Sequence, residues 1–366
     1  MPRSTPTPRA EVLRSSPLAR LLFFAYVLLV AYASLYPLTG WRDPGVSVFA
    51  FLTGAWPRYV TPFDVAANLL GYLPLGFLCV LAVHSRLSAP LAVLIALAAG
   101  SCLSIALEAA QSLLPARIPS KLDVLSNAAG ALSGALLAVP LARWLLGKGP
   151  LLALRTAWFT PGPRTDFGLV LLALWLLTQL DATTLLFGAG DLRESFAPPA
   201  GAVHAPELFV TIEALVAFGH LVAVAALASA LVSATASARA VVSILLLAAL
   251  AVKTLAFAIV FQAQNVFSWL TPGALQGLAF GAPAALLVVA LPRTLRLALA
   301  ALLLIGGTTL VNFAPTNPYL AAILKLWQQG HFLNLNGLTR LVSALWPTVA
   351  LIYVFTLMAA RPGRSA

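Results

Sequence analysis

The sequence contains few charged residues. Only 9% of its 366 residues are Asp, Glu, Lys or Arg, whereas soluble globular domains carry about a quarter. So few charges cannot cover a surface that faces water, and the mean hydropathy of +0.95 points the same way. Intrinsic disorder is excluded because 61% of the residues are hydrophobic, and disordered chains have low hydrophobicity. The class that remains is an all-α, polytopic membrane protein.

Cysteine is also scarce. The only two cysteines, Cys79 and Cys102, exclude a disulfide scaffold and a cysteine-based zinc site. The sequence has no Gly-rich phosphate loop, no Ser-His-Asp order and no HExxH motif, so we expect no metal and no other cofactor. The net charge of +11 comes from single basic residues between apolar runs. No run is dense enough to bind a nucleic acid, and the expected partners are membrane lipids.

Apolar runs separated by prolines and short polar clusters predict the topology. A bilayer core of about 30 Å needs about 20 apolar residues per helix. On this scale the sequence predicts ten spans, at 20–38, 63–83, 90–114, 122–146, 167–187, 206–232, 240–261, 273–291, 295–314 and 341–360.

The longest connection on the side of the termini divides the chain. Residues 147–166 contain Pro161-Gly162-Pro163 and separate a four-span module at 20–146 from a six-span module at 167–366. Residues 1–19 form a tail. Within 315–340 we expect a short helix at the membrane surface, with Trp327 at headgroup level, and His331 in a solvated loop.

Lysine and arginine predict the orientation. Fourteen lie on one side of the predicted spans and seven on the other, which by the positive-inside rule places both termini in the cytoplasm. The first span follows a basic segment and contains Ala31-Tyr32-Ala33, a pattern typical of signal-peptide cleavage. Because apolar residues continue through Leu38, we interpret it as an uncleaved span.

An eleven-residue pattern occurs twice, at the starts of the second and fourth spans. Residues 61–71 and 120–130 share Ser/Thr-x-x-Asp-Val-x-x-Asn-x-x-Gly. Thr61 and Ser120 are natural N-caps, and the Asp three residues later resembles a capping box. The two asparagines can hydrogen-bond across helices, and the two glycines allow close helix approach. These four residues are Asn68, Asn127, Gly71 and Gly130.

The third span carries a polar stripe that should meet this repeat. Ser101, Ser104, Glu108 and Gln111 are spaced three, four and three residues apart, which places them on one helix face. Glu108 and Gln111 lie near the outer end, where both copies of the pattern begin. The predicted pocket therefore consists of Asp64, Asn68, Ser104, Glu108, Gln111, Arg117, Asp123 and Asn127.

The charges of this predicted pocket do not balance. Three carboxylates face two nearby cations, Arg117 and Lys121, so at least one carboxyl should be protonated, bound to a cation, or ready for a basic ligand group. A structural interpretation stays open, with the Asp residues as caps, the Asn residues as interhelical contacts and Arg117 as the counter-ion of Glu108. Ionisable residues in spans are nevertheless typical of functional sites.

The C-terminal module has its own buried charges. Glu213 lies about 10 Å and Lys253 about 12 Å below the outer ends of consecutive spans, at about 1.5 Å per residue. Matched depth predicts a structural ion pair between them. His220 follows Glu213 by seven residues on the same face, which fits either a proton relay or a packed histidine.

Residues 21–146 resemble the VanZ-like family. The resemblance rests on Ser34-Leu35-Tyr36-Pro37, on Asp64 with Asn68-Leu69-Leu70-Gly71-Tyr72-Leu73-Pro74-Leu75-Gly76, on Glu108-Ala109-Ala110-Gln111, on Pro115-Ala116-Arg117, and on 123–130. It implies a bacterial inner-membrane protein with a polar site at the outer face. The family is named after a protein linked to low-level resistance to teicoplanin, a glycopeptide that binds cell-wall precursors. The six additional spans depart from the short family form.

Two classes of function fit these observations. The first is a cell-envelope factor whose outward-facing pocket binds or modifies a lipid-linked or peptidoglycan-related group. Whether it is an enzyme stays open, with Asp64, Glu108 or Asp123 as acid or base. The alternative is a multi-pass transporter, for which repeated modules and charges near the membrane midplane are typical.

Overall fold

The computed structural model describes residues 16–57, 59–84, 86–146, 150–193, 206–260, 266–314 and 333–360. In these residues the regular structure is helical, with one isolated β-bridge between Phe159 and Val232. The chain divides into two compact units, Met1–Arg155 and Thr156–Ala366. Their boundary falls within α6, Pro150–Trp158, a short helix inside the connection at 147–166.

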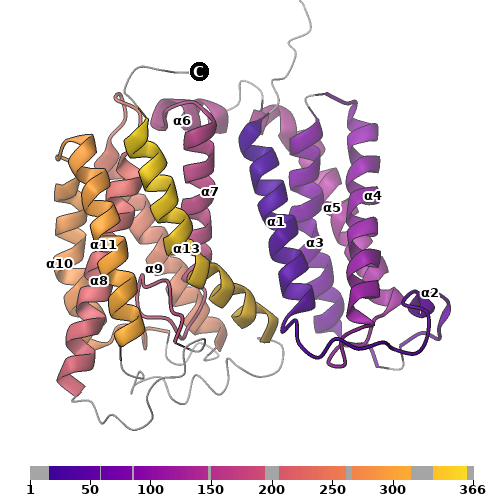
Figure 1. Ribbon diagram of the computed structural model, residues 1–366. Helices are drawn as coiled ribbons and strands as arrows, with labels where there is room; N and C mark the ends of the chain where they lie inside the picture. The colour runs from indigo at the N-terminus through magenta and orange to yellow at the C-terminus, as the bar shows by residue number, and fades with distance from the viewer. Residues whose placement is uncertain are drawn as a thin grey trace, which may run out of the picture. The chain divides into compact units, whose positions relative to one another are not determined.

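The N-terminal unit is built from four long helices. They are α1 Pro17–Leu35, α3 Pro62–Val83, α4 Ala89–Gln111 and α5 Lys121–Leu146, and the short α2, Ala50–Thr53, lies in the α1–α3 connection. The helices run alternately up and down, so α3 and α5 both begin at the end of the unit where α2 lies (Figure 1).

Glycines bring α3 and α5 into backbone contact. A Cβ added at Gly76 would lie 1.8 Å from the carbonyl oxygen of Ala131, and one at Gly134 would lie 1.9 Å from that of Leu73. Such distances leave no room for any side chain, and small residues are what permits this approach in membranes. The two helices are therefore held at a fixed register, which aligns their starting ends.

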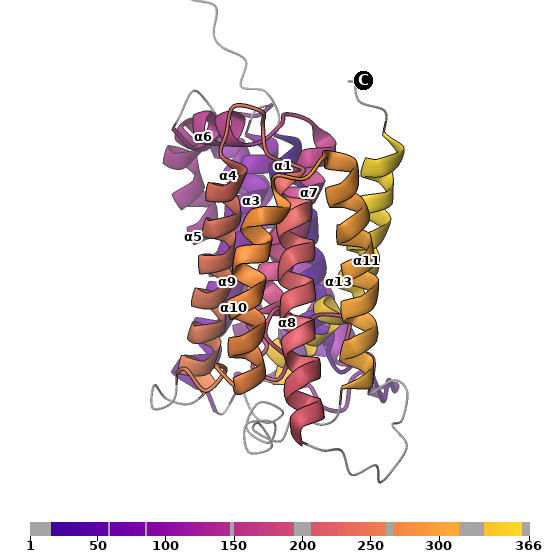
Figure 2. The same ribbon diagram turned by 90° about the vertical axis from the view of Figure 1, so that its left-hand side faces the viewer.

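The described part of the C-terminal unit is a bundle of six helices. Its helices are α7 Pro163–Thr178, α8 Pro206–Ser229, α9 Ala238–Val260, α10 Pro272–Val288, α11 Arg293–Phe313 and α13 Leu333–Ala359. Figure 2 shows α9, α10, α8 and α11 side by side. The central helix is α8, because 67% of the residues in its most apolar 18-residue stretch are buried, against 28% in the corresponding stretch of α9.

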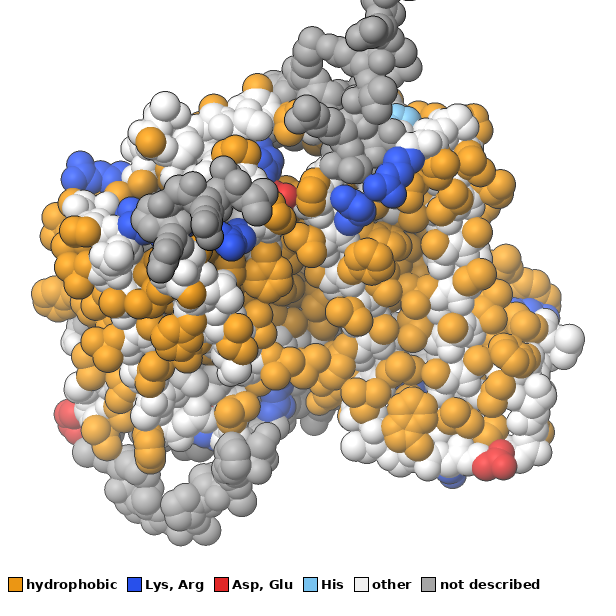
Figure 3. Space-filling model, turned by 45° about the horizontal axis from the view of Figure 1, so that its top comes forward, with side chains coloured by type: hydrophobic (Ala, Val, Ile, Leu, Met, Phe, Trp, Pro, Cys, Tyr) orange, Lys and Arg blue, Asp and Glu red, His pale blue; other side chains and the backbone are white. Residues whose placement is uncertain are grey.

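Eight of the described helices are long and apolar enough to cross a membrane, and they are α1, α3, α4, α5, α8, α9, α11 and α13. Hydrophobic side chains dominate the flanks of each unit, as Figure 3 shows for one face. The chain is therefore a multi-pass integral membrane protein. The sequence predicted ten spans, and the other two correspond to shorter helices, α10 with 17 residues and α7 with 16.

The predicted span at 167–187 is wrong as a continuous helix. Helix α7 ends at Thr178, and residues 179–193 are irregular but largely buried. The reason is local polar competition: Asp181 Oδ1 accepts hydrogen bonds from the Thr183 N–H at 2.8 Å and the Thr183 hydroxyl at 2.7 Å, which turns the chain away from the helix.

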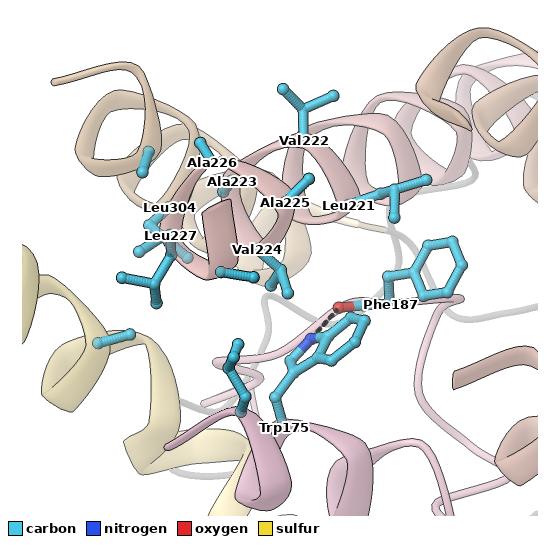
Figure 4. Packing of buried hydrophobic residues seen from close by; sticks show 14 of the residues in the cluster. Trp175, Phe187, Leu221, Val222, Ala223, Val224, Ala225, Ala226, Leu227 and Leu304 are labelled. Carbon is cyan, nitrogen blue, oxygen red and sulfur yellow. Dashed lines mark hydrogen bonds between the residues drawn. The ribbon is translucent and has the colours of Figure 1, made fainter. Parts of the chain in front are cut away.

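Apolar packing holds this irregular segment in the bundle. Trp175 of α7 stacks on Phe187 with ring centroids 5.9 Å apart, and its Nε1 donates to the Phe187 carbonyl at 3.4 Å. Figure 4 shows the Trp175 ring below Val224 of α8 and the Phe187 ring to its right, below Leu221. At the last span, α13 begins at Leu333 rather than at 341. The predicted surface helix with Trp327, and His331, lie outside the described residues.

Candidate functional site

The exposed edge of the predicted pocket is the cap of α3. Thr61 Oγ1 accepts a hydrogen bond from the Asp64 N–H at 3.0 Å and donates one to Asp64 Oδ2 at 2.5 Å. This is the N-cap expected from the sequence, and it fixes an exposed carboxylate at the end of the N-terminal unit. The favourable helix dipole keeps a negative charge stable at this position.

Glu108 lies at the buried side of the same end. Its side chain is only 5% exposed, and Oε2 accepts a hydrogen bond from the Ser120 N–H at 2.7 Å. Ser120 in turn caps α5, because its Oγ accepts from the Leu122 N–H at 3.1 Å. The last turn of α4 and the first turn of α5 are thus joined through one carboxylate.

Asp123 connects the exposed edge of the predicted pocket, at Asp64, with its buried side, at Glu108. Its side chain faces Asn68 of α3, and it lies close enough to Asp64 and Glu108 to interact electrostatically with both. Asn68 and Asp123 are half-buried, between exposed Asp64 and buried Glu108. The four side chains form a polar track that leads from the surface into the end of the bundle.

A buried amide lies beyond this track. Asn127 Nδ2 donates to Ser104 Oγ at 2.9 Å, and the hydroxyl of Tyr72 also faces Ser104. Asn127 Oδ1 is buried and accepts no hydrogen bond from the residues that the structure describes. Most buried polar atoms have a partner, and an exception requires an explanation such as a water or a ligand.

Gln111 and Arg117 donate hydrogen bonds to carbonyls at the end of α1. Gln111 Nε2 donates to the carbonyl of Ser34, and Arg117 Nη2 donates to that of Tyr36, both at 2.7 Å. They therefore hold the end of α1 against α4 and the α4–α5 loop. Burial lowers the pKa of the Arg117 guanidinium, and the nearby Glu108 carboxylate opposes this shift.

The second cation at this end, Lys121, points toward the α1–α3 connection. Its Nζ donates to the Gly54 carbonyl at 2.6 Å and lies 4.6 Å from the centroid of the Trp56 ring. The polar track is therefore left with more carboxylates than cations. No group of three or more His, Cys, Asp or Glu that could hold a metal ion occurs in the part of the chain that the structure describes.

The hydrogen bonds of Lys253 and Glu213 go to residues other than the predicted partner, and the ion pair between the two charges stays a prediction. Lys253 Nζ instead donates to the carbonyls of Asp181 at 2.6 Å and Thr184 at 2.9 Å. Glu213 Oε1 accepts from the Thr271 hydroxyl at 2.6 Å, at the cap of α10. The two charges interact electrostatically, and the ammonium donates its hydrogen bonds to oxygens of the irregular segment.

His220 has the surroundings of a packed side chain. It is fully buried, and its Nδ1 lies 3.1 Å from the carbonyl oxygen of Val216 in the same helix. The imidazole fills the space beside Gly307, where a Cβ would lie 2.6 Å from His220 Cε1. His220 therefore joins α8 to α11 by packing against Gly307, rather than as part of a hydrogen-bonded chain to Glu213.

Sequence reasoning missed the polar residues around Lys253. Asp181 is completely buried, and its Oδ2 accepts a hydrogen bond from the Thr339 hydroxyl at 3.2 Å. The signal was present in the sequence, because Gln179, Asp181, Thr183 and Thr184 follow one another inside a predicted span. Such a cluster, which ends four positions before Gly188 and six before Gly190, predicts a break in the helix rather than its continuation.

Comparison with known proteins places the N-terminal unit in a family. Residues 22–146 match the VanZ/LLP1 family, so this part of the chain is a VanZ/LLP1 domain, as the sequence motifs indicated. Beyond residue 146, the regular structure of the described residues is helical, apart from the one β-bridge. No curated protein and no solved structure matches the chain.

Proposed function

We propose that the VanZ/LLP1 domain of this multi-pass membrane protein binds the polar headgroup of an envelope lipid or of a lipid-linked, peptidoglycan-related precursor. The observation that carries the proposal is the graded polar track. Asp64 is exposed, Asn68 and Asp123 are half-buried, and Glu108 is buried, all at one end of the helices. A headgroup enters at this end, while its lipid chains stay beside the apolar helix flanks.

The chemistry of the track favours a ligand that donates hydrogen bonds. Carboxylates accept them and do not donate when ionised, and the cations Arg117 and Lys121 are engaged with backbone carbonyls. Sugar hydroxyls, amides and amines are donors of this kind. Asn127 Oδ1 supplies one further acceptor at the deep end.

The orientation belongs to the same proposal. We infer ten crossings, with the eight long helices completed by α7 and α10, and both termini in the cytoplasm of a bacterium. The polar track then opens on the outer face of the cytoplasmic membrane. A reporter that is active only in the cytoplasm is expected to be active when it is fused after Arg361. Activity of a periplasmic reporter at this position would place the opening of the polar track on the cytoplasmic side and would contradict the proposed orientation.

A role in glycopeptide resistance follows from the same ligand class. Teicoplanin binds cell-wall precursors, so a protein that holds or sequesters the headgroup of such a precursor changes what the antibiotic can reach. The carboxylates Glu108 and Asp123 could also serve as acid and base in a modification of the headgroup.

Native mass spectrometry of the purified protein tests headgroup binding. A lipid or lipid-linked molecule is expected to co-purify with the wild type and to be lost in Glu108→Gln and Asp123→Asn, which keep the shape of the side chain. Glu207→Gln is the matched control, because Glu207 is exposed at the start of α8 in the other unit. Equal co-purification in all variants would contradict the proposal.

Transport is the second candidate function, and one observation in the C-terminal unit favours it. Irregular backbone follows α7 inside the bundle, and Glu213 faces the N-terminal end of α10. Broken helices whose ends face opposite charges are typical of carrier sites. Under this alternative, Glu108→Gln would leave the flux of the transported solute into proteoliposomes intact, whereas Lys253→Ala or Glu213→Gln would abolish this flux.

A further inference from the structure

The irregular segment at 179–190 lacks the internal hydrogen bonds of a helix, although it lies inside a membrane protein. Backbone polar groups at membrane depth are tolerated only where the protein or a water-filled cavity satisfies them. Here the surrounding helices do so: Asn312 Nδ2 donates to the Gly190 carbonyl, and the Gly190 N–H donates to the Ser343 carbonyl, both at 2.7 Å. One end of the segment is thus fixed by neutral groups.

The other end is fixed by a charge. Lys253 Nζ donates to the Asp181 carbonyl at 2.6 Å, to the Thr184 carbonyl at 2.9 Å and to the Thr184 hydroxyl at 3.3 Å. Lys253 is only 1% exposed. The segment wraps three oxygen atoms around one positive charge, and these use all three donors of an ammonium group.

Negative charge and an aromatic ring complete the surroundings of the ammonium. The Asp181 carboxylate is buried, is held by Thr183 and Thr339, and attracts Lys253 electrostatically. The Nζ atom lies 5.9 Å from the centroid of the Phe257 ring, within the range of a cation–π contact. Glu213 of α8 adds a second, more distant carboxylate.

We propose that the Asp181 and Thr184 carbonyls, with the Thr184 hydroxyl, form a binding site for a small monovalent cation, which the ammonium of Lys253 fills as a tethered ion. Carbonyls of unwound backbone are the groups that hold Na⁺ or a proton in membrane carriers. The site closes residues 179–190 against the bundle while a charge is present and releases them when it is absent. This inference is independent of headgroup binding by the N-terminal unit.

The site is selective by size and charge. Three oxygens from two residues three positions apart form a small cage, so the site accepts Na⁺, ammonium or methylammonium, which are no larger than the end of the lysine side chain. A quaternary cation such as choline has no N–H donor and is too wide. A purely structural lysine would behave differently, because its role would depend on the tether and no free cation could replace it.

Hydrogen–deuterium exchange of Lys253→Ala in nanodiscs tests the site. At constant ionic strength in choline chloride, amides of residues 179–190 are expected to exchange at least tenfold faster than in the wild type. Replacing choline with methylammonium, ammonium or sodium should restore protection with saturable dependence on concentration. The wild type should respond equally to all four salts. Absence of restoration, or protection of Lys253→Ala in choline chloride equal to that in the other three salts, would overturn the proposal.

Two further measurements keep the test decisive. If Lys253→Ala does not fold in choline chloride, its folded yield should rise when it is purified in methylammonium chloride, and equal failure in both salts would contradict the site. With Lys253 intact, Thr184→Val removes one of the three oxygens and should speed exchange of 179–190 several-fold. Thr184→Ser keeps that oxygen and should not, so equal effects of the two substitutions would also count against the proposal.

Discussion

The two units accommodate polar groups in opposite ways. In the N-terminal unit, α3 and α5 touch backbone to backbone through Gly76, Gly130 and Gly134, and the polar residues gather where the helices begin and end. In the C-terminal unit, the polar residues lie inside the bundle around an irregular segment, with Asp181 and Lys253 almost completely buried. One unit therefore presents its charges to one end, and the other encloses them.

Packing density explains the difference. Where helix backbones are in contact, no volume is left for a long polar side chain between them, so the carboxylates lie at the helix ends, and Asp64 and Asp123 occupy first turns that the helix dipole favours. A broader bundle leaves a space that an irregular segment fills, provided that side chains such as Lys253 and Asn312 satisfy its carbonyls. The comparison predicts that the N-terminal unit is sensitive to added volume and the C-terminal unit to lost charge.

The largest effect is expected for alanine at the contact glycines. A Cβ at Gly134 would lie 1.9 Å from the Leu73 carbonyl oxygen, and backbone cannot move aside as a side chain can. Overpacking typically costs about 1–3 kcal/mol and occasionally more, so Gly134→Ala together with Gly76→Ala should prevent folding of the N-terminal unit. Circular dichroism and size-exclusion chromatography in detergent measure this directly.

Gly71 provides the matched control. It belongs to the same repeated pattern as Gly130, but a Cβ at Gly71 would meet nothing within 4 Å. Gly71→Ala should therefore be neutral or stabilise α3 by up to about 1 kcal/mol through helix propensity. If Gly71→Ala and Gly134→Ala lowered the melting temperature equally, backbone contact would not be what limits the N-terminal unit.

The next effect concerns lost charge in the C-terminal unit. Lys253→Met leaves the carbonyls of Asp181 and Thr184 without their donor and the buried Asp181 carboxylate without its cation. Removing one partner of a buried pair costs about 3–5 kcal/mol. The double variant Lys253→Met with Asp181→Asn should lose less than the sum of the two single variants, as measured by thermal unfolding in detergent.

The same double-mutant cycle with Glu213 separates the two carboxylates. Glu213 interacts with Lys253 electrostatically but accepts its hydrogen bond from Thr271. The coupling energy between Lys253→Met and Glu213→Gln should therefore be smaller than the coupling energy between Lys253→Met and Asp181→Asn. A larger coupling energy with Glu213 than with Asp181 would instead support the ion pair between Glu213 and Lys253 that helix depth predicted.

Much of the N-terminal unit could be predicted from the sequence, whereas the interior of the C-terminal unit could not. Thr61 and Ser120 cap their helices through local hydrogen bonds, and local chemistry is visible in a sequence. The two glycines of the repeated pattern have the same sequence context, but only Gly130 meets a facing backbone. Which of two equivalent helix faces is buried depends on tertiary packing.

The partner of Lys253 shows the same limit. Helix depth correctly indicated that Lys253 is buried, but it offered Glu213 as the only acceptor at that level. The actual acceptors are backbone carbonyls of an irregular segment, and carbonyls carry no sequence signal. The orientation of Gln111 and Arg117 toward α1 was missed for the same reason, since both donate to carbonyls.

A smaller effect is expected at the cap of α10. A Cβ at Gly273 would lie 2.5 Å from Glu213 Oε2 and 2.6 Å from the Val210 carbonyl oxygen. The carboxylate can rotate but the carbonyl cannot, so Gly273→Ala should cost about 1–3 kcal/mol. Gly306→Ala is the control in the same unit, because nothing lies within 4 Å of its Cβ. Equal melting temperatures for both variants would show that α8 and α10 can separate freely.

The smallest effect is expected where the irregular segment reaches its exposed end. Arg193 donates to both carboxylate oxygens of Asp191, at 3.0 and 2.6 Å, and its Nη1 donates to the Ala314 carbonyl at 2.8 Å. Burial alone would raise the pKa of Asp191, but the hydrogen bonds and charge of Arg193 outweigh it and hold that pKa below its ordinary value. Both side chains are about one-third exposed, so solvent screens the pair and its contribution should be about 0.2–1 kcal/mol.

The pH dependence of this pair distinguishes an ionised carboxylate from a neutral contact. Because the pKa of Asp191 is depressed in the folded state, its stabilisation is fully present above the unfolded value of about 3.9 and is lost as the pH falls through the folded value. Asp191→Asn should therefore lower the melting temperature slightly at neutral pH and have a vanishing effect well below about pH 4. Asp43→Asn is the control, because Asp43 is exposed and its Oδ1 accepts a hydrogen bond from the Gly45 N–H rather than from a cation. A difference that persists or grows in acid would show that Arg193 does not hold Asp191 ionised, and that the exposed end of the segment depends on neutral contacts, as its Gly190 contacts do.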